Sequence, residues 1–284
     1  MNKPISKTLQ LRISLPTFHP LKRSMHLLLF VLFFPYCALA QYEGRAQIDS
    51  LRTALNLHAG KDKARVDILN VLSGEYYKTV QKDSGRHYAE AALKMAGELN
   101  YKKGMVTACR CIAVGISNMG DTTQADLYYQ KAFTISKGAG DRKGMITDLR
   151  GLGSLYRKHY FRSLDYYQQA LTIAQQMSRD SELAAIYLDM ARLSKAFAHY
   201  PKALGEFQKA LSISTRSGNR QTEATSLFEI GFFYNNLGDS ARSISYIKRC
   251  LILNRQLKNK REVAKSLGML GAIYMNHHEY DISL

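Results

Sequence analysis

Hydrophobic positions recur with helical spacing in many segments of the chain. Over residues 200–211, Ala203, Phe207 and Ala210 lie at i, i+4 and i+7 and therefore share one helix face. The same small–large–small spacing is found at Ala125, Tyr129 and Ala132, at Ser163, Tyr167 and Ala170, and at Ser243, Ile247 and Cys250. A face of this kind predicts a helix wedged between two others.

A second pattern recurs at a nearly constant interval. A large residue is followed three positions later by an apolar–small pair and usually, three further on, by an aromatic residue, as in Leu149, Leu152-Gly153 and Tyr156. The large residue recurs at Leu69, Cys109, Leu149, Tyr187, Leu227 and Leu267, at intervals of 40, 40, 38, 40 and 40. Because each small residue lets a neighbouring helix approach closely, the two patterns predict an all-α solenoid of repeated helix pairs.

These residues resemble the tetratricopeptide repeat, whose pattern is W-x2-L-G-x2-Y followed by A-x3-F and a second Ala. The resemblance covers about residues 64–284, although Trp is absent and the closing Pro is missing. The period of 40 residues is longer than the ~34 of the family pattern and is similar to its longer-helix variant. The resemblance implies antiparallel helix pairs stacked into a right-handed superhelix with a concave groove.

The pattern divides the chain into an N-terminal segment (1–40), a helix or cap (41–63) and a repeat array (64–284) with about five full units and a truncated sixth. A first helix is predicted from Arg45 to His58. The glycine- and Asp- or Asn-containing stretches 138–141, 217–219, 120–121 and 238–239 predict the turns. The single interval of 38 predicts irregular geometry over residues 157–162, either a tighter turn or a helix shorter by half a turn.

The first forty residues are typical of a secretory signal peptide. Five basic residues and no acidic residue precede or flank the apolar block 27–34, and Ala38-Leu39-Ala40 follows it. The alternative is an uncleaved anchor, which the short block disfavours because a spanning helix needs ~20 apolar residues. We expect cleavage after Ala40 and a secreted or periplasmic mature chain.

Motifs that carry catalysis are absent from the sequence. It contains no G-x-x-x-x-G-K-[ST], H-E-x-x-H or G-x-S-x-G. His277-His278 is predicted in the turn of the last unit, with no partners for a metal. Cys109 and Cys250 fall on core positions, and a disulfide is left open because three cysteines of the mature chain leave one over. The sequence predicts no enzyme, no cofactor and no metal site.

A ligand surface is predicted on the outward side of the first helix of each unit, because this helix lines the groove in the family that the chain resembles. The net charge is +17, of which +5 lies in residues 1–40, leaving +12 for the rest. Basic and amide residues, with aromatic residues between them, predict a groove for an extended peptide, acidic or with a free carboxylate. Tyr77 is expected to add apolar surface. The candidate groove residues are Lys78, Arg110, Asn118, Arg150, Arg157, Lys158, Arg192, Lys195, Phe228, Phe232, Asn235 and Asn236. The alternative is an ordinary solvated face.

The function predicted from these features is a non-catalytic protein- or peptide-binding scaffold outside the cytoplasm. Nucleic acid is not expected as a partner, because aromatic and basic residues are not interleaved in any one segment. The alternative is the truncated sensor region of a membrane histidine kinase or a transcriptional regulator. This alternative is supported by the early end of the sixth unit, which stops at Leu284, early in its second helix.

Overall fold

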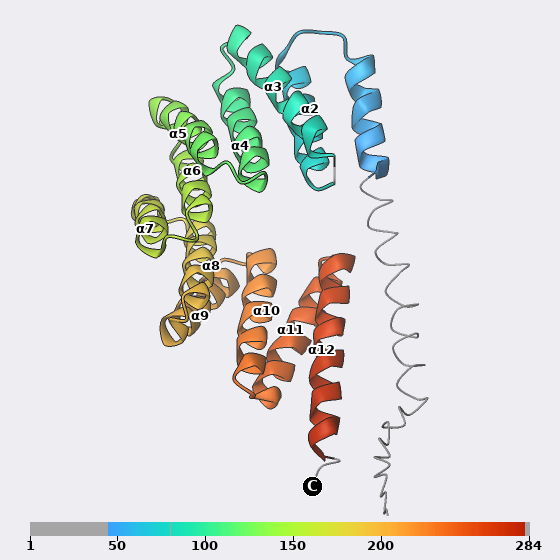
Figure 1. The fold of residues 1–284 in the computed structure, drawn as a ribbon, viewed down its shortest axis with the longest axis vertical. Coiled ribbons are helices and arrows are strands. Elements are labelled where there is room, and N and C mark those ends of the chain that lie inside the picture. The colour runs from blue at the N-terminus through green and yellow to red at the C-terminus, as the bar shows by residue number, and fades with distance from the viewer. Residues whose placement is uncertain (1–44, 80, 282–284) are drawn as a thin grey trace, which may run out of the picture. The chain divides into compact units, whose positions relative to one another are not determined.

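A computed structural model describes residues 45–79 and 81–281, and within these ranges every regular element is a helix (Figure 1). The described residues form one compact unit. Residues 45–57 form the first helix. The others are α2 (Lys63–Tyr77), α3 (Lys82–Glu98), α4 (Lys102–Asn118), α5 (Thr122–Gly138), α6 (Arg142–Leu155), α7 (Tyr160–Gln176), α8 (Asp180–Ala196), α9 (Tyr200–Arg216), α10 (Arg220–Asn236), α11 (Ser240–Gln256) and α12 (Lys260–Asp281). The all-α prediction is confirmed, whereas the signal peptide and its cleavage site lie outside the described residues.

The helices form two layers. We call α2, α4, α6, α8, α10 and α12 the A helices, and α3, α5, α7, α9 and α11 the B helices. Among α2 to α12, helices α4, α6, α8 and α10 each pack against the B helices before and after them, α2 packs against α3, and α12 packs against α11. Consecutive A helices also contact each other, whereas each B helix contacts only A helices. This arrangement of neighbouring antiparallel pairs is that of a helical solenoid.

The spacing seen in the sequence places the buried side chains between the layers. Ala203, Phe207 and Ala210 of α9 are fully buried, and the corresponding triplets of α5, α7 and α11 are buried as well. Leu149 and Tyr156 of α6 are buried against them. The small–large–small faces therefore are, as predicted, the surfaces on which the A helices pack.

Most turns use the local chemistry that the sequence indicates. Gly120 and Gly238 adopt positive φ angles of 94° and 77° just after α4 and α10. Asp121 and Asp239 then accept a hydrogen bond from a backbone N–H in the first turn of α5 and α11. These glycine–aspartate turns end one helix and cap the next.

The short interval between α6 and α7 is absorbed by the end of α6. This helix has 14 residues, whereas α10 has 17. The Ser163 hydroxyl donates to the Gly153 carbonyl at 2.7 Å, and the Ser243 hydroxyl donates to the Gly231 carbonyl at 2.8 Å. The same helix–helix contact is kept, and the missing residues come from the end of α6, so the predicted irregularity is confirmed in the form of a shorter helix.

Helix α12 differs from the other A helices in two ways. The predicted turn at His277-His278 is wrong, because the helix continues through these residues to Asp281. Leu267 and Tyr274 are 46% and 42% exposed, whereas residues at the same positions of α10 are buried. The cause is that no B helix packs on the free side of α12 within the part of the chain that the structure describes.

Candidate binding surface on the A helices

The basic residues of the predicted groove form ion pairs from one A helix to the next. Arg110 of α4 donates to Asp148 of α6 at 2.6 Å, and Arg150 of α6 donates to Asp189 of α8 at 2.6 Å. Arg192 of α8 then continues the series with a carboxylate of α10 at 3.0 Å. These arginines therefore hold neighbouring repeats together, and the surface is far less positive than the arginines alone imply.

The Arg110–Asp148 pair is the most buried of the series. Asp148 is fully buried and also accepts a hydrogen bond from the Ser136 hydroxyl at 2.8 Å. Arg110 makes a second bond, to the Gly144 carbonyl at 2.9 Å. Burial raises the pKa of the Asp148 carboxyl, and the hydrogen bond and charge of Arg110 work against that rise. Because Asp148 is fully buried and Arg110 bonds to two acceptors of α6, this pair is a structural element of the array.

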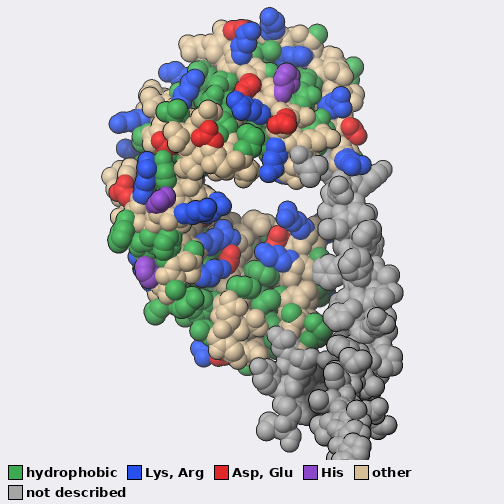
Figure 2. Space-filling view, viewed as in Figure 1, with side chains coloured by type: hydrophobic (Ala, Val, Ile, Leu, Met, Phe, Trp, Pro, Cys, Tyr) green, Lys and Arg blue, Asp and Glu red, His purple; other side chains and the backbone are tan. Residues whose placement is uncertain are grey.

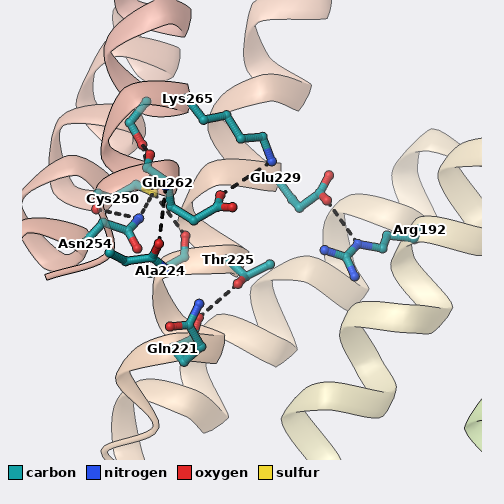
Figure 3. Close-up of polar contacts among 11 residues, drawn as sticks. Arg192, Gln221, Ala224, Thr225, Glu229, Cys250, Asn254, Glu262 and Lys265 are labelled. Atoms are coloured by element: carbon teal, nitrogen blue, oxygen red, sulfur yellow. Dashed lines mark hydrogen bonds and ion pairs between the residues drawn. The ribbon is translucent and has the colours of Figure 1, made fainter. Parts of the chain in front are cut away.

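The last pairing is more open and contains more groups. Glu229 of α10 accepts hydrogen bonds from Arg192 at 3.0 Å and from Lys195 at 2.8 Å. Two half-buried rings of α10 flank it: Lys195 lies 5.1 Å from the centre of the Phe232 ring, and Lys265 of α12 lies 4.1 Å from that of Phe228. Figure 3 shows Arg192 reaching Glu229 from α8, with Lys265 on the other side of Glu229. We call these residues the Glu229 cluster: Arg192, Lys195, Phe228, Glu229, Phe232 and Lys265.

Electrostatics keep Glu229 ionised. Burial raises the pKa of its carboxyl, but the hydrogen bonds and charges of Lys195 and Arg192 outweigh this effect and lower the pKa below its usual value. Arg192 is 44% and Lys195 26% exposed. Since a guanidinium has five donors and an ammonium three, both cations keep N–H groups that a ligand oxygen can use.

Other predicted groove residues lie at the ends of the A helices. Lys78 is the C-cap of α2 and pairs with Glu75 at 2.7 Å. Asn118, Asn235 and Asn236 are the terminal residues of α4 and α10. Arg157 and Lys158 were expected on the outward side of α6, but this helix ends at Leu155 and both residues are exposed in the turn that follows.

Tyr77 does not add apolar surface to the groove as predicted. Gly115 of α4 lies under its ring: a Cβ at that glycine would come within 2.3 Å of the Tyr77 hydroxyl oxygen. The Tyr77 hydroxyl is buried without a hydrogen-bond partner, and burial raises its pKa to about 12. The side chain is therefore a packing element between α2 and α4.

Sequence reasoning missed the acidic half of the surface, namely Asp148, Asp189 and Glu229. They follow their arginine partners by 38, 39 and 37 residues. A search for opposite charges at about one repeat length would have found them.

The described residues offer little to metal or redox chemistry. No group of three or more His, Cys, Asp or Glu side chains within them is arranged to hold a metal ion. Cys109, Cys111 and Cys250 are free thiols, and Cys109 and Cys250 are buried as predicted. Among the described helices, none is both long and apolar enough to span a membrane.

Comparison with known proteins supports the architecture. A family model described as tetratricopeptide repeat matches residues 224–257, which cover most of α10 and α11. No curated protein sequence matches the chain.

Solved structures with the same fold share little sequence with the chain. BtubC from P. vanneervenii has a TM-score of 0.56 and 17% identity, over 76% of this chain and 90% of that one. Aspartyl phosphate phosphatase F from Bacillus subtilis has a TM-score of 0.57 and 14% identity, over 82% of this chain and 68% of that one. A Rap protein complexed with Competence and Sporulation Factor has a TM-score of 0.59 and 13% identity, over 87% of this chain and 74% of that one. Residues 224–257 are thus a tetratricopeptide repeat, and the helical array that contains them is a tetratricopeptide-type solenoid.

Proposed function

We propose that the chain is a non-catalytic scaffold that binds a protein or an extended peptide on its A helices. The observation that carries this proposal is the Glu229 cluster, where half-buried aromatic rings lie beside cations with unused N–H donors. The Rap protein of similar fold, complexed with Competence and Sporulation Factor, supports a binding role. Aromatic residues and Arg are the side chains most often responsible for binding energy at such surfaces.

The cluster favours a ligand with both apolar and acidic groups. Phe232 belongs to none of the hydrophobic core clusters, so the accessible part of its half-buried ring is available to an apolar side chain. Arg192 and Lys195 can donate to a carboxylate, either of an acidic residue or of a C-terminus. Glu229 limits the net charge, so a polyanion without apolar groups is the poorer ligand.

The test is selection from a displayed peptide library on the immobilised chain, followed by affinity measurements with the Phe232→Ala variant. We expect the loss of an aromatic anchor to cost about 2 kcal/mol, or roughly 30-fold in Kd. Ile252→Ala is the matched control, because Ile252 is 57% exposed on the B helix of the same pair. Equal affinities for Phe232→Ala and the parent chain would place the ligand elsewhere.

A second comparison identifies the acidic group. The selected peptides are measured with a free C-terminal carboxylate and with a C-terminal amide, and again with their acidic residues changed to amides. Changing the carboxylate that contacts Arg192 and Lys195 to an amide should weaken binding to the parent chain. The same change should have no effect on binding to the Lys195→Met variant. If the amide peptides bind as well as the acids, the cations have no role in recognition.

We further propose that the chain acts outside the cytoplasm after removal of residues 1–40. The support is the signal-like order of basic, apolar and small residues before Gln41. Mass spectrometry of the chain recovered from its native host is the test: a mature N-terminus at Gln41 supports the proposal, and an intact N-terminus in the cytoplasm contradicts it. Reading the coding sequence past residue 284 tests the alternative sensor function, which requires a spanning helix and an output domain there.

A further inference from the structure

A continuous aromatic surface lies where two adjacent A helices turn into their B helices. We call it the aromatic edge; its residues are Tyr160, Phe161, Phe197, His199 and Tyr200. The Tyr160 ring lies 5.4 Å from Phe161, 5.2 Å from Phe197 and 4.8 Å from His199, centre to centre. Phe161 is 84% and Tyr200 49% exposed. In Figure 2, green hydrophobic side chains lie beside blue and purple basic ones over the region of α7 to α9.

Positive charge surrounds the aromatic edge. Residues 157–162 and 197–202 include Arg157, Lys158, Arg162 and Lys202 and contain no Asp or Glu. Lys202 donates to the Tyr160 hydroxyl at 2.9 Å, and Arg162 stacks on the Tyr156 ring at 3.5 Å. Arg157 and Lys158 are exposed. Unlike the arginines between the A helices, these cations make no direct ion pair among the described residues, although Asp126 lies near Arg162 and Glu206 near Lys202.

These two turns carry no side-chain cap, and the same is true of the turns before α3, α4 and α8. His159 and His199 occupy the N-cap positions of α7 and α9 and make no side-chain cap hydrogen bond. Ala198 has a positive φ of 58°, where the turn after α10 has glycine. The two turns therefore resemble other uncapped turns of the array, and what distinguishes them is their exposed aromatic and basic side chains.

We propose that the aromatic edge docks on an anionic lipid surface. Its exposed rings stand on the turns at helix ends, a position from which they can reach a flat partner, whereas peptide-binding anchors fill pockets. Tyr and Phe at the level of the lipid headgroups, with Lys and Arg beside them, are the composition of peripheral membrane-binding surfaces. Exposed cations near an anionic bilayer add to the attraction until salt screens them. This surface is separate from the Glu229 cluster, so either proposal can fail without the other.

The absence of Trp from the sequence makes a local test possible in the full chain. Phe161→Trp introduces a single indole into the aromatic edge, and Leu127→Trp introduces one on α5, at a position that is 65% exposed and is not one of the residues of the edge. Both variants are mixed with vesicles that contain phosphatidylglycerol and with vesicles of phosphatidylcholine alone. We expect the emission of Phe161→Trp to shift to the blue, and brominated lipids to quench it, only with phosphatidylglycerol. We expect no change for Leu127→Trp.

A charge reversal completes the test. In the Phe161→Trp background, Arg157→Glu with Lys158→Glu should weaken vesicle binding at least tenfold, because each basic residue near an anionic surface contributes about fivefold. Lys102→Glu with Lys103→Glu makes the same change of charge at the start of α4 and should have a small effect. Circular dichroism verifies that all variants keep their helix content. Equal shifts of both indoles, no shift with either vesicle, or equal weakening by the two reversals would overturn the proposal.

Discussion

The pair α6–α7 and the pair α10–α11 bury side chains of the same kinds but differ in their turns and in their charged groups. In each pair, a serine of the B helix donates to a glycine carbonyl of the A helix, at 2.7 Å for Ser163 and 2.8 Å for Ser243. Leu149 and Leu227 are both buried at the same position. However, the residue just before Leu149 is the ionisable Asp148, whereas the residue just before Leu227 is Ser226, whose hydroxyl is buried without a partner.

In these two helix pairs the buried apolar residues are alike, whereas the polar residues differ. The α10–α11 pair has the Gly238-Asp239 turn, and the α6–α7 pair has a shortened helix followed by Arg157, Lys158 and the aromatic edge. Conversely, α10 carries Glu229 two residues after Leu227, whereas α6 has Gly151 two residues after Leu149. The two proposed binding surfaces therefore use positions at which the two pairs differ.

The largest expected effect concerns the buried Asp148 of α6, whose place in α10 is taken by Ser226. Arg110→Met leaves Asp148 buried without its cation and should lower the free energy of unfolding by about 3–5 kcal/mol. Arg150→Met should cost only about 1 kcal/mol, because Asp189 stays partly exposed and lies 3.9 Å from Arg192. Urea denaturation followed by circular dichroism measures both.

A double variant identifies the cause. Adding Asp148→Ser to Arg110→Met reproduces the polar group found in α10 and should recover more than half of the loss, because no buried charge remains. If Arg110→Met and Arg150→Met lowered the free energy of unfolding equally, burial of the carboxylate would not determine the size of the loss.

The next effect concerns the glycines at which the helices of a pair approach. A Cβ at Gly153 would lie 2.5 Å from the Tyr167 ring, and one at Gly231 would lie 2.6 Å from the Ile247 Cδ1 atom. Because a ring cannot bend away and an aliphatic end can, Gly153→Ala should lower the free energy of unfolding by about 2–3 kcal/mol and Gly231→Ala by about 1 kcal/mol. Ile247→Val removes the Cδ1 atom but keeps Cγ1, which lies 2.8 Å from the added Cβ, so it should recover only part of the loss in Gly231→Ala; no recovery at all would place the strain elsewhere.

A smaller and pH-dependent effect tests the carboxylate of Glu229, which α10 carries where α6 has Gly151. The folded state lowers the pKa of Glu229, so its stabilisation is fully present above the unfolded pKa and is lost as pH falls through the folded pKa. At neutral pH, Glu229→Gln should reduce the free energy of unfolding by about 1–2 kcal/mol. The difference from the parent chain should shrink as the solution is acidified below about pH 4. A constant difference across this range would show that the carboxylate charge is not the source.

The sequence predicts the fold well because packing between helices depends on spacing along one helix. Ala203, Phe207 and Ala210 have one possible face, and the structure buries it. The ion pairs were not predictable in the same way. Whether Arg192 contacts Glu229 depends on the rotation and offset of α8 against α10, which the spacing within either helix does not contain. Arg157 and Lys158 were misplaced for a related reason: the repeat length gave the number of missing residues, but not whether helix or turn would lose them.

The smallest effect tests whether the uncapped turn of α6–α7 sacrifices stability. His159 is the N-cap of α7 with an extended backbone (φ −119°, ψ 91°), a conformation in which an Asp side chain can accept from the first-turn N–H groups as Asp239 does before α11. His159→Asp should therefore raise the free energy of unfolding by about 0.5–1 kcal/mol. It also places a negative charge beside Arg157 and Lys158, so vesicle binding by the Phe161→Trp reporter should weaken at the same time. A gain in stability without any loss of lipid binding would mean that the histidine at this cap is not retained for the aromatic edge.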